Sequence, residues 1–284
     1  MSPPAGGDLG VLVNIMAILK GAIQMTGGIK GVSFYSLKGS DKVFMRTKGV
    51  PTKNQLANSP NYSEVRKQQK EFGGCSKFGS LARYSFGGLH RLADYNMTPV
   101  LNGIGKNLMK LDTTSEKGRR NLKLTAHKQA LEGFNFNRNF PFSSVLRVAP
   151  QWQLERDTLK AVVTIPRINT NIDLQNIQKL PFFRLIVVLG TISDMAFNPI
   201  VNEYEPLVDG LHGHSAVLTG EWQTTQTILP EQTMIVQMHP TEIVEMNNNV
   251  TVLLSMGVEF GNVGYTDEPV EVKNAGCGKV IASR

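Results

Sequence analysis

The chain has 284 residues, of which 41% are hydrophobic and 19% charged, a composition that excludes large-scale disorder and allows one large domain or two ordinary ones. Its net charge of +7 is unevenly distributed: residues 1–140 hold 21 Lys/Arg and 8 Asp/Glu, whereas residues 141–284 hold 9 and 15. These balances of +13 and −6 indicate a polyanionic partner for the basic half or head-to-tail attraction between copies, unless the halves neutralise each other within one molecule.

An apolar stretch near the N-terminus, Leu9 to Met25, is interpreted as a buried strand or short helix. It lacks a preceding basic region and a small-residue cleavage site, and Asn14 and Lys20 interrupt it, so it does not have the pattern of a cleavable signal peptide. It is also too short to span a bilayer. We expect no membrane span, and an extracellular or particle-associated location reached without a cleaved leader is favoured.

The segment Gly31 to Thr47 has the pattern of a β-hairpin. Aromatic and β-branched residues alternate on either side of a turn at Lys38–Asp41. Both faces of this ribbon carry apolar side chains, and an isolated two-stranded ribbon is marginal in water. We therefore expect it to lie against its own core or a neighbouring subunit. The candidate assembly interface consists of Val32, Phe34, Tyr35, Val43, Phe44 and Met45.

Two helices are predicted after the hairpin. Ser59 is a natural N-cap and Pro60 suits the first turn, so the spacing predicts a helix from there that ends at Gly73–Gly74. Thr98 followed by Pro99 predicts a second helix. The basic half of the chain is thus expected to combine a hairpin with helices.

Basic side chains cluster on these helices and in the segment that follows. They could neutralise phosphates, and Tyr62, Tyr84 and Phe86 could stack on bases. Against this reading, the chain has no helix-turn-helix, zinc-finger or RNP pattern, and the aromatic residues have the spacing of a core. The residues that would bind nucleic acid under this alternative are Arg66, Lys67, Lys70, Arg119, Arg120 and Lys123.

From about residue 141 the pattern changes to short strands separated by turn signals. The predicted strands are Leu159–Ile165, Phe183–Ile192, Ala216–Ile228, Thr233–Met238 and Asn249–Phe260, with a final pair at Val270–Lys273 and Lys279–Ala282. Such a series predicts an antiparallel, Ig-like β-sandwich. The absence of alternating helices argues against a doubly wound parallel sheet. The predicted fold class is α+β, with a basic hairpin-and-helix region at 1–140 and a sandwich domain at 141–284.

Catalytic and metal-binding motifs are not recognisable in the sequence. It has no GxSxG or HExxH motif, and Gly276–Lys279 is followed by Val280, where a phosphate-binding loop needs a hydroxyl. His212 and His214 alternate and could share a metal, but a third ligand is missing, so exposed histidines on a glycine-rich loop are the preferred interpretation. The acidic residues of the second half are interpreted as a solvated surface. We expect no catalytic residue, metal or cofactor, and no enzymatic activity.

The N-terminal half also resembles a known group of sequences. The matching segments are Gly28–Tyr35, Lys48–Gly49, Thr52, Gln55–Leu56, Glu71–Phe72 and Gly133–Asn137. They are similar to an uncharacterised family found in Bacteroidota and their mobile elements. The resemblance covers mainly residues 16–140 and implies an architecture of a glycine-rich hairpin, a basic helical stretch and a β-rich C-terminal domain. It carries no known activity.

Together these features predict a non-enzymatic structural subunit that assembles with copies of itself into a filament, sheath or particle. The hairpin would pair with a sheet edge of another copy, and the oppositely charged halves would favour head-to-tail contacts. The alternative is a nucleic-acid-binding protein that uses its basic half. A sandwich that binds carbohydrate or another ligand would need an exposed aromatic platform, and the only tryptophans are Trp152 and Trp222.

Overall fold

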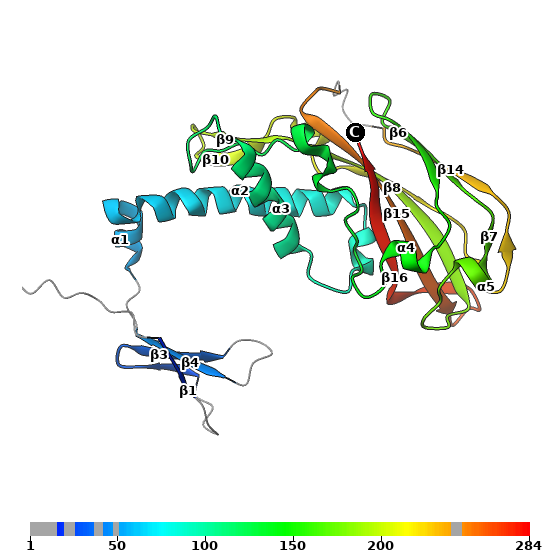
Figure 1. The fold of residues 1–284 in the computed structure, drawn as a ribbon, viewed down its shortest axis with the longest axis horizontal. Coiled ribbons are helices and arrows are strands. Elements are labelled where there is room, and N and C mark those ends of the chain that lie inside the picture. The colour runs from blue at the N-terminus through cyan, green and yellow to red at the C-terminus, as the bar shows by residue number, and fades with distance from the viewer. Residues whose placement is uncertain (1–15, 20–25, 37–41, 48–50, 240–245) are drawn as a thin grey trace, which may run out of the picture. The chain divides into compact units, whose positions relative to one another are not determined.

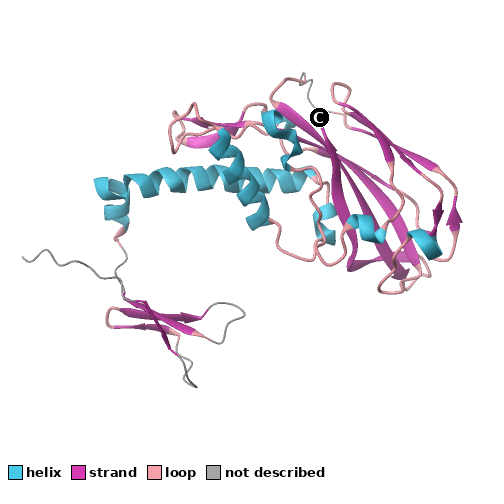
Figure 2. Cartoon of the chain, viewed as in Figure 1, coloured by secondary structure: helices cyan, strands magenta, loops and turns pink. Residues whose placement is uncertain are grey.

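The computed structural model describes residues 16–19, 26–36, 42–47, 51–239 and 246–284. The chain forms two compact units, Met1–Val65 and Arg66–Arg284, and Figure 1 shows their elements. The fold class is α+β, as predicted, with an N-terminal hairpin sheet, helices and C-terminal antiparallel sheets (Figure 2). The sequence predicts a boundary near residue 140, whereas the basic helices here belong to the same unit as the C-terminal strands.

The N-terminal unit contains a four-stranded antiparallel sheet in the order β1-β4-β3-β2. Its strands are β1 (Met16–Leu19), β2 (Gly27–Ile29), β3 (Val32–Ser36) and β4 (Val43–Thr47). The predicted hairpin is confirmed, because β3 and β4 are antiparallel neighbours. Its predicted turn, Lys38–Asp41, lies outside the described residues. The predicted apolar stretch contributes β1, and its remaining residues also lie outside the described ones.

The long helices are α2 (Ser63–Ser85) and α3 (Thr98–Leu111). The predicted end of the first helix at Gly73–Gly74 is wrong, because α2 continues to Ser85. Glycine is a poor helix former, but a side chain at Gly74 would collide with Met109 of α3, so close packing between the helices outweighs local propensity. No helix in the described part of the chain is long and apolar enough to cross a membrane.

The remaining helical segments are short. They are α1 (Lys53–Asn58), η1 (Pro60–Tyr62), η2 (Leu89–Leu92), η3 (Thr125–Ala130), α4 (Phe142–Val145), α5 (Thr170–Asp173) and η4 (Asp209–Leu211). The helix start predicted at Ser59 is the cap of the single turn η1, which leads into α2.

The C-terminal strands form two larger antiparallel sheets, β11-β8-β15-β16 with β12 beside β8, and β14-β6-β5. The strands are β5 (Gln151–Glu155), β6 (Lys160–Ile165), β7 (Ile168–Asn169), β8 (Phe182–Ser193), β9 (Met195–Asn198), β10 (Glu203–Pro206), β11 (Ser215–Thr219), β12 (Gln223–Thr224), β13 (Ile228–Leu229), β14 (Gln232–Gln237), β15 (Val250–Val263) and β16 (Pro269–Ser283). Two strand predictions need correction. The single strand predicted over Ala216–Ile228 is divided into shorter ones, and the predicted final pair is one continuous strand, β16.

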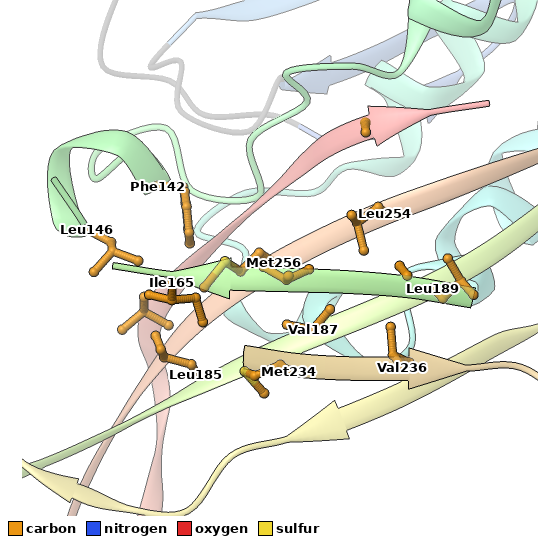
Figure 3. Packing of buried hydrophobic residues seen from close by; sticks show 14 of the residues in the cluster. Phe142, Leu146, Ile165, Leu185, Val187, Leu189, Met234, Val236, Leu254 and Met256 are labelled. Carbon is orange, nitrogen blue, oxygen red and sulfur yellow. The ribbon is translucent and has the colours of Figure 1, made fainter. Parts of the chain in front are cut away.

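The sheet that contains β8 is buried on both faces. Leu185, Val187 and Leu189 of β8 belong to the core shared with β6 and β14 (Figure 3), whereas Ile186 and Val188 belong to the core shared with α2 and α3. Alternate residues of a strand point to opposite faces, so a strand covered on both sides must be apolar throughout. This double burial explains the unbroken apolar run Leu185–Leu189 within β8. The unit therefore has three layers: helices, the β8 sheet and the β14-β6-β5 sheet.

Candidate assembly and anion-binding sites

The residues predicted to form the assembly interface lie side by side on β3 and β4, but they are divided between two faces. Phe34 pairs with Met45 across the strands, and Tyr35 pairs with Phe44. The rings of Tyr35 and Phe44 are stacked, with centroids 5.6 Å apart, and the Arg46 guanidinium lies 5.7 Å from the Tyr35 centroid. Each face of the sheet thus carries its own small apolar group.

Few hydrophobic side chains of β2, β3, β4 and α1 are buried. Among the residues of these four elements whose burial the structure describes, Val43, 4% exposed, is the only buried hydrophobic one. The two hydrophobic clusters formed by the described residues are built from residues after this unit. A small sheet needs a hydrophobic face covered by other elements for independent stability. The sheet is therefore expected to require a partner surface.

The edge strand β2 is suited to pairing with a further strand. Gly27, Gly28 and Ile29 are exposed. Positive φ angles at Lys30 (25°) and Gly31 (81°) make the two-residue turn that joins β2 to β3. Ile29 and Val32, which flank this turn, form a pair joined by main-chain hydrogen bonds. Hydrogen-bonded and non-hydrogen-bonded pairs alternate along an antiparallel ladder, so the next pair, Gly28 with Ser33, is not hydrogen-bonded. The N–H and C=O of Gly28 therefore point away from β3. An edge of this kind is a template for another chain.

Arg120, one of the residues predicted to bind nucleic acid, belongs instead to an internal ion network around Glu71. Glu71, fully buried in α2, accepts hydrogen bonds from Arg120 Nε (2.7 Å) and Nη2 (2.6 Å), from Lys106 Nζ (3.2 Å) and from the main-chain N–H of Gly118 (2.8 Å). This network ties α2 to α3 and to the segment after it. Arg120, 18% exposed, neutralises this carboxylate, so we leave it out of the candidate interface.

Two other predicted residues, Lys70 and Arg119, meet at an aromatic ring that sequence reasoning missed. The Lys70 ammonium lies 5.2 Å and the Arg119 guanidinium 5.7 Å from the centroid of Phe197 in β9. Phe197 comes directly before the Asn198–Pro199 turn signal, but nothing in the sequence places it beside α2. The structure therefore brings together two cations and a stacking surface from three separate segments.

Lys70 and Phe197 line a groove of about 320 Å³ between α2 and the β9–β10 hairpin. Lys70 donates to the side-chain oxygen of Asn202 (2.6 Å), and Lys77 donates to the main-chain oxygen of Tyr204 (2.9 Å). Both acceptors are neutral, so these bonds leave the positive charges uncompensated. One carboxylate, Glu203, also lines the groove. The arrangement is suited to binding an anion next to a planar ring.

Two further residues predicted for nucleic-acid binding are Lys67 and Lys123. Lys67 packs against Gly118, the residue before Arg119, and Lys123 is exposed in the segment after α3. Of the predicted stacking residues, Phe86 is fully buried and contacts Phe134 and Phe136, so it belongs to the core. Tyr84 is 57% exposed.

The expectation of two exposed histidines is wrong for His212. It is 6% exposed, and its Nδ1 accepts a hydrogen bond from the Ser193 main-chain N–H (3.0 Å). Burial lowers the pKa of His212 to about 4, so the imidazole is neutral at physiological pH. His214 is exposed. The described residues contain no group of three His, Cys, Asp or Glu that could hold a metal ion.

Comparison of the chain with protein-family models, curated proteins and solved structures finds no match.

Proposed function

We propose that the protein is a structural subunit that assembles with copies of itself, and that the β2 edge of its N-terminal sheet adds to a sheet of another copy. The observation that supports this most is the scarcity of buried hydrophobic side chains in β2, β3 and β4, where Val43 is the only one among the residues whose burial is described. Strand addition supplies main-chain hydrogen bonds at the edge and covers apolar side chains at the same time.

Charge distribution favours a second copy as the partner. The +13 balance of residues 1–140 and the −6 balance of residues 141–284 attract each other when copies meet head to tail. When the contact joins two different surfaces of the subunit, each added copy offers a free surface to the next one. The assembly then grows as a filament unless the rotation between neighbouring copies closes it into a ring. The product would be a filament, sheath or particle, and the assembly should weaken at high salt, where such attraction is screened.

The main test compares two variants of one edge residue. Gly28→Pro removes an N–H that points away from β3, whereas Gly28→Ala keeps it. We expect Gly28→Pro to abolish or strongly reduce assembly and Gly28→Ala to assemble like the unmodified protein. Size-exclusion chromatography with light scattering at low and high salt measures the mass, and negative-stain electron microscopy shows the form of the product.

Deletion of residues 1–47 is the companion experiment. Both hydrophobic clusters lie after this segment, so the remaining chain should stay folded by circular dichroism. It should also be monomeric. A deleted protein that still forms large assemblies, or an unmodified protein that stays monomeric when concentrated, would contradict the proposal.

A second candidate function is binding of single-stranded nucleic acid, favoured by the meeting of Lys70 and Arg119 at Phe197. Bases stack on aromatic rings without much sequence preference, and basic side chains follow the phosphates. The groove has both components, although it lacks a recognisable nucleic-acid-binding motif.

For this candidate, the double variant Lys70→Glu/Arg119→Glu should weaken binding of a labelled oligothymidine at least about tenfold and flatten its salt dependence. Fluorescence anisotropy over a series of salt concentrations measures both effects. Arg167→Glu, an exposed charge reversal in the second half of the chain, is the control and should have little effect. Equal affinity of the double variant and the control would contradict a role for this groove.

A further inference from the structure

A cleft of about 120 Å³ in the C-terminal unit shares no lining residue with the two sites described above. It is formed where the segment after η2, the segment before α4, the loop after α5 and the strands β15 and β16 meet. Carboxamide side chains dominate its polar lining, and none of the described residues that line it is basic. Its carboxamides are Asn137, Asn139, Gln175, Gln178 and Asn274.

One wall of the cleft is fixed by hydrogen bonds within the chain. Asn137 is 3% exposed; its side-chain nitrogen donates to Gly276 O (3.1 Å), and its side-chain oxygen accepts from the Phe140 N–H (2.8 Å). The two carboxylate oxygens of Asp94 accept from the main-chain N–H groups of Arg138 (2.9 Å) and Asn139 (3.0 Å). The backbone of this wall is therefore fixed before any ligand arrives, which lowers the cost of binding.

Another part of the lining comes from an irregular stretch of β16. The pairing of β15 with β16 shifts register between Glu259 and Gly261, and Asn274 lies in this interval with a φ of 60°. Bulges of this kind redirect side chains and are frequent beside binding sites. Here the irregular stretch places Asn274 in the lining of the cleft.

Two phenylalanines contribute to the apolar part of the lining, together with Val145, Ile177 and Ala275. Phe140 is 40% exposed, whereas Phe260 is 6% exposed. The cleft thus combines aromatic surface with groups that both donate and accept hydrogen bonds. Apolar walls with a few converging polar groups are typical of small-molecule sites.

We propose that this cleft binds one ring of a neutral saccharide. A carboxamide offers one acceptor oxygen and two N–H donors, and a sugar hydroxyl also donates and accepts, so the two are complementary. The C–H face of a sugar ring is apolar and can lie on a phenylalanine ring. The volume of about 120 Å³ is below that of a cavity of about 150 Å³ that holds benzene, so the cleft would cover one face or edge of a single ring and leave the rest in solvent. The lack of a basic residue disfavours phosphate and carboxylate ligands.

The proposal can be tested on the full chain with defined probes. Saturation-transfer NMR and calorimetry would measure binding of methyl β-glucopyranoside, methyl α-mannopyranoside and N-acetylglucosamine. Triglycine and inorganic phosphate would be tested in the same way, as representatives of a peptide ligand and an anionic ligand. We expect at least one sugar to bind and neither competitor to do so. The variant Gln178→Ala/Asn274→Gly should bind about tenfold more weakly, because two hydrogen-bonding groups are lost.

The choice of variants keeps the result interpretable. Asn274→Gly removes the carboxamide at a positive φ that glycine adopts without strain. Gln153→Ala, an exposed carboxamide on β5 outside the cleft, is the matched control and should bind sugar like the unmodified protein. The proposal is overturned if no sugar binds, if triglycine or phosphate binds instead, or if a folded Gln178→Ala/Asn274→Gly protein keeps full affinity.

Discussion

Glu71→Gln is expected to destabilise the protein by about 3 kcal/mol, because it removes the buried anion on which two cations converge. Removal of one partner from a buried ion pair costs about 3–5 kcal/mol, and partial exposure of Lys106 (34%) and Arg120 (18%) places this site at the lower end. Urea denaturation measures the change. The control Glu116→Gln changes an exposed carboxylate four positions before Arg120 and should alter stability by less than about 0.5 kcal/mol.

The same residue should contribute a defined pH dependence. Burial opposes ionisation of Glu71, but hydrogen bonds from Arg120, Gly118 and Lys106 outweigh it and lower the pKa from 4.5 to about 2. Because the folded-state pKa is below the unfolded-state value, the stabilisation is fully present above pH 4.5 and is lost as the pH falls toward 2. The shift corresponds to about 3 kcal/mol.

Unfolding free energies measured across this pH range should therefore fall more steeply for the unmodified protein than for Glu71→Gln. Two curves that run parallel over the range would show that Glu71 does not titrate with a lowered pKa. A loss of stability in the variant that is no larger than that of Glu116→Gln would contradict the network itself.

Local pattern predicts several of the longer elements of this protein but not their associations. The β3–β4 pairing follows from period-two alternation, and the start of α3 follows from Thr98 and Pro99, because these signals lie within a few residues. The length of α2 does not follow, since what overrides Gly73–Gly74 is packing against residues more than 30 positions away. A glycine in a helical pattern therefore indicates a helix end, except where a neighbouring element packs so closely that no side chain fits, as at Gly74.

In the candidate sites, too, the sequence identifies individual residues but not which of them come together in the fold. Lys70 and Arg119 can be recognised as part of a basic half, but Phe197 lies in a later strand, and only the fold brings it to them. Conversely, Arg120 is indistinguishable from Arg119 in the sequence, although it binds the buried Glu71. Charge and composition indicate which surfaces to search, and the tertiary contacts decide which side chains are available.

The packing contact between the end of α2 and β8 is the second place where a single substitution should strongly destabilise the protein. Gly190→Ala is expected to destabilise the protein by at least about 3 kcal/mol, because a methyl group there would overlap the main-chain carbonyl oxygen of Ser85 at the end of α2. Main-chain atoms cannot avoid this overlap by changing rotamer. Gly190 is also paired on both sides, opposite Ser215 of β11 and Leu253 of β15, so the strand cannot shift without breaking two ladders.

The matched control for this prediction is Gly103→Ala. Gly103 lies in α3, is exposed and has open space where a side chain would project, so alanine should stabilise the protein by about 1 kcal/mol through helix propensity. Thermal and urea unfolding of both variants would then change in opposite directions. If Gly190→Ala is as stable as the unmodified protein, the helix layer does not approach the sheet as closely as the contact at Ser85 requires, and the three-layer arrangement of the C-terminal unit would have to be revised.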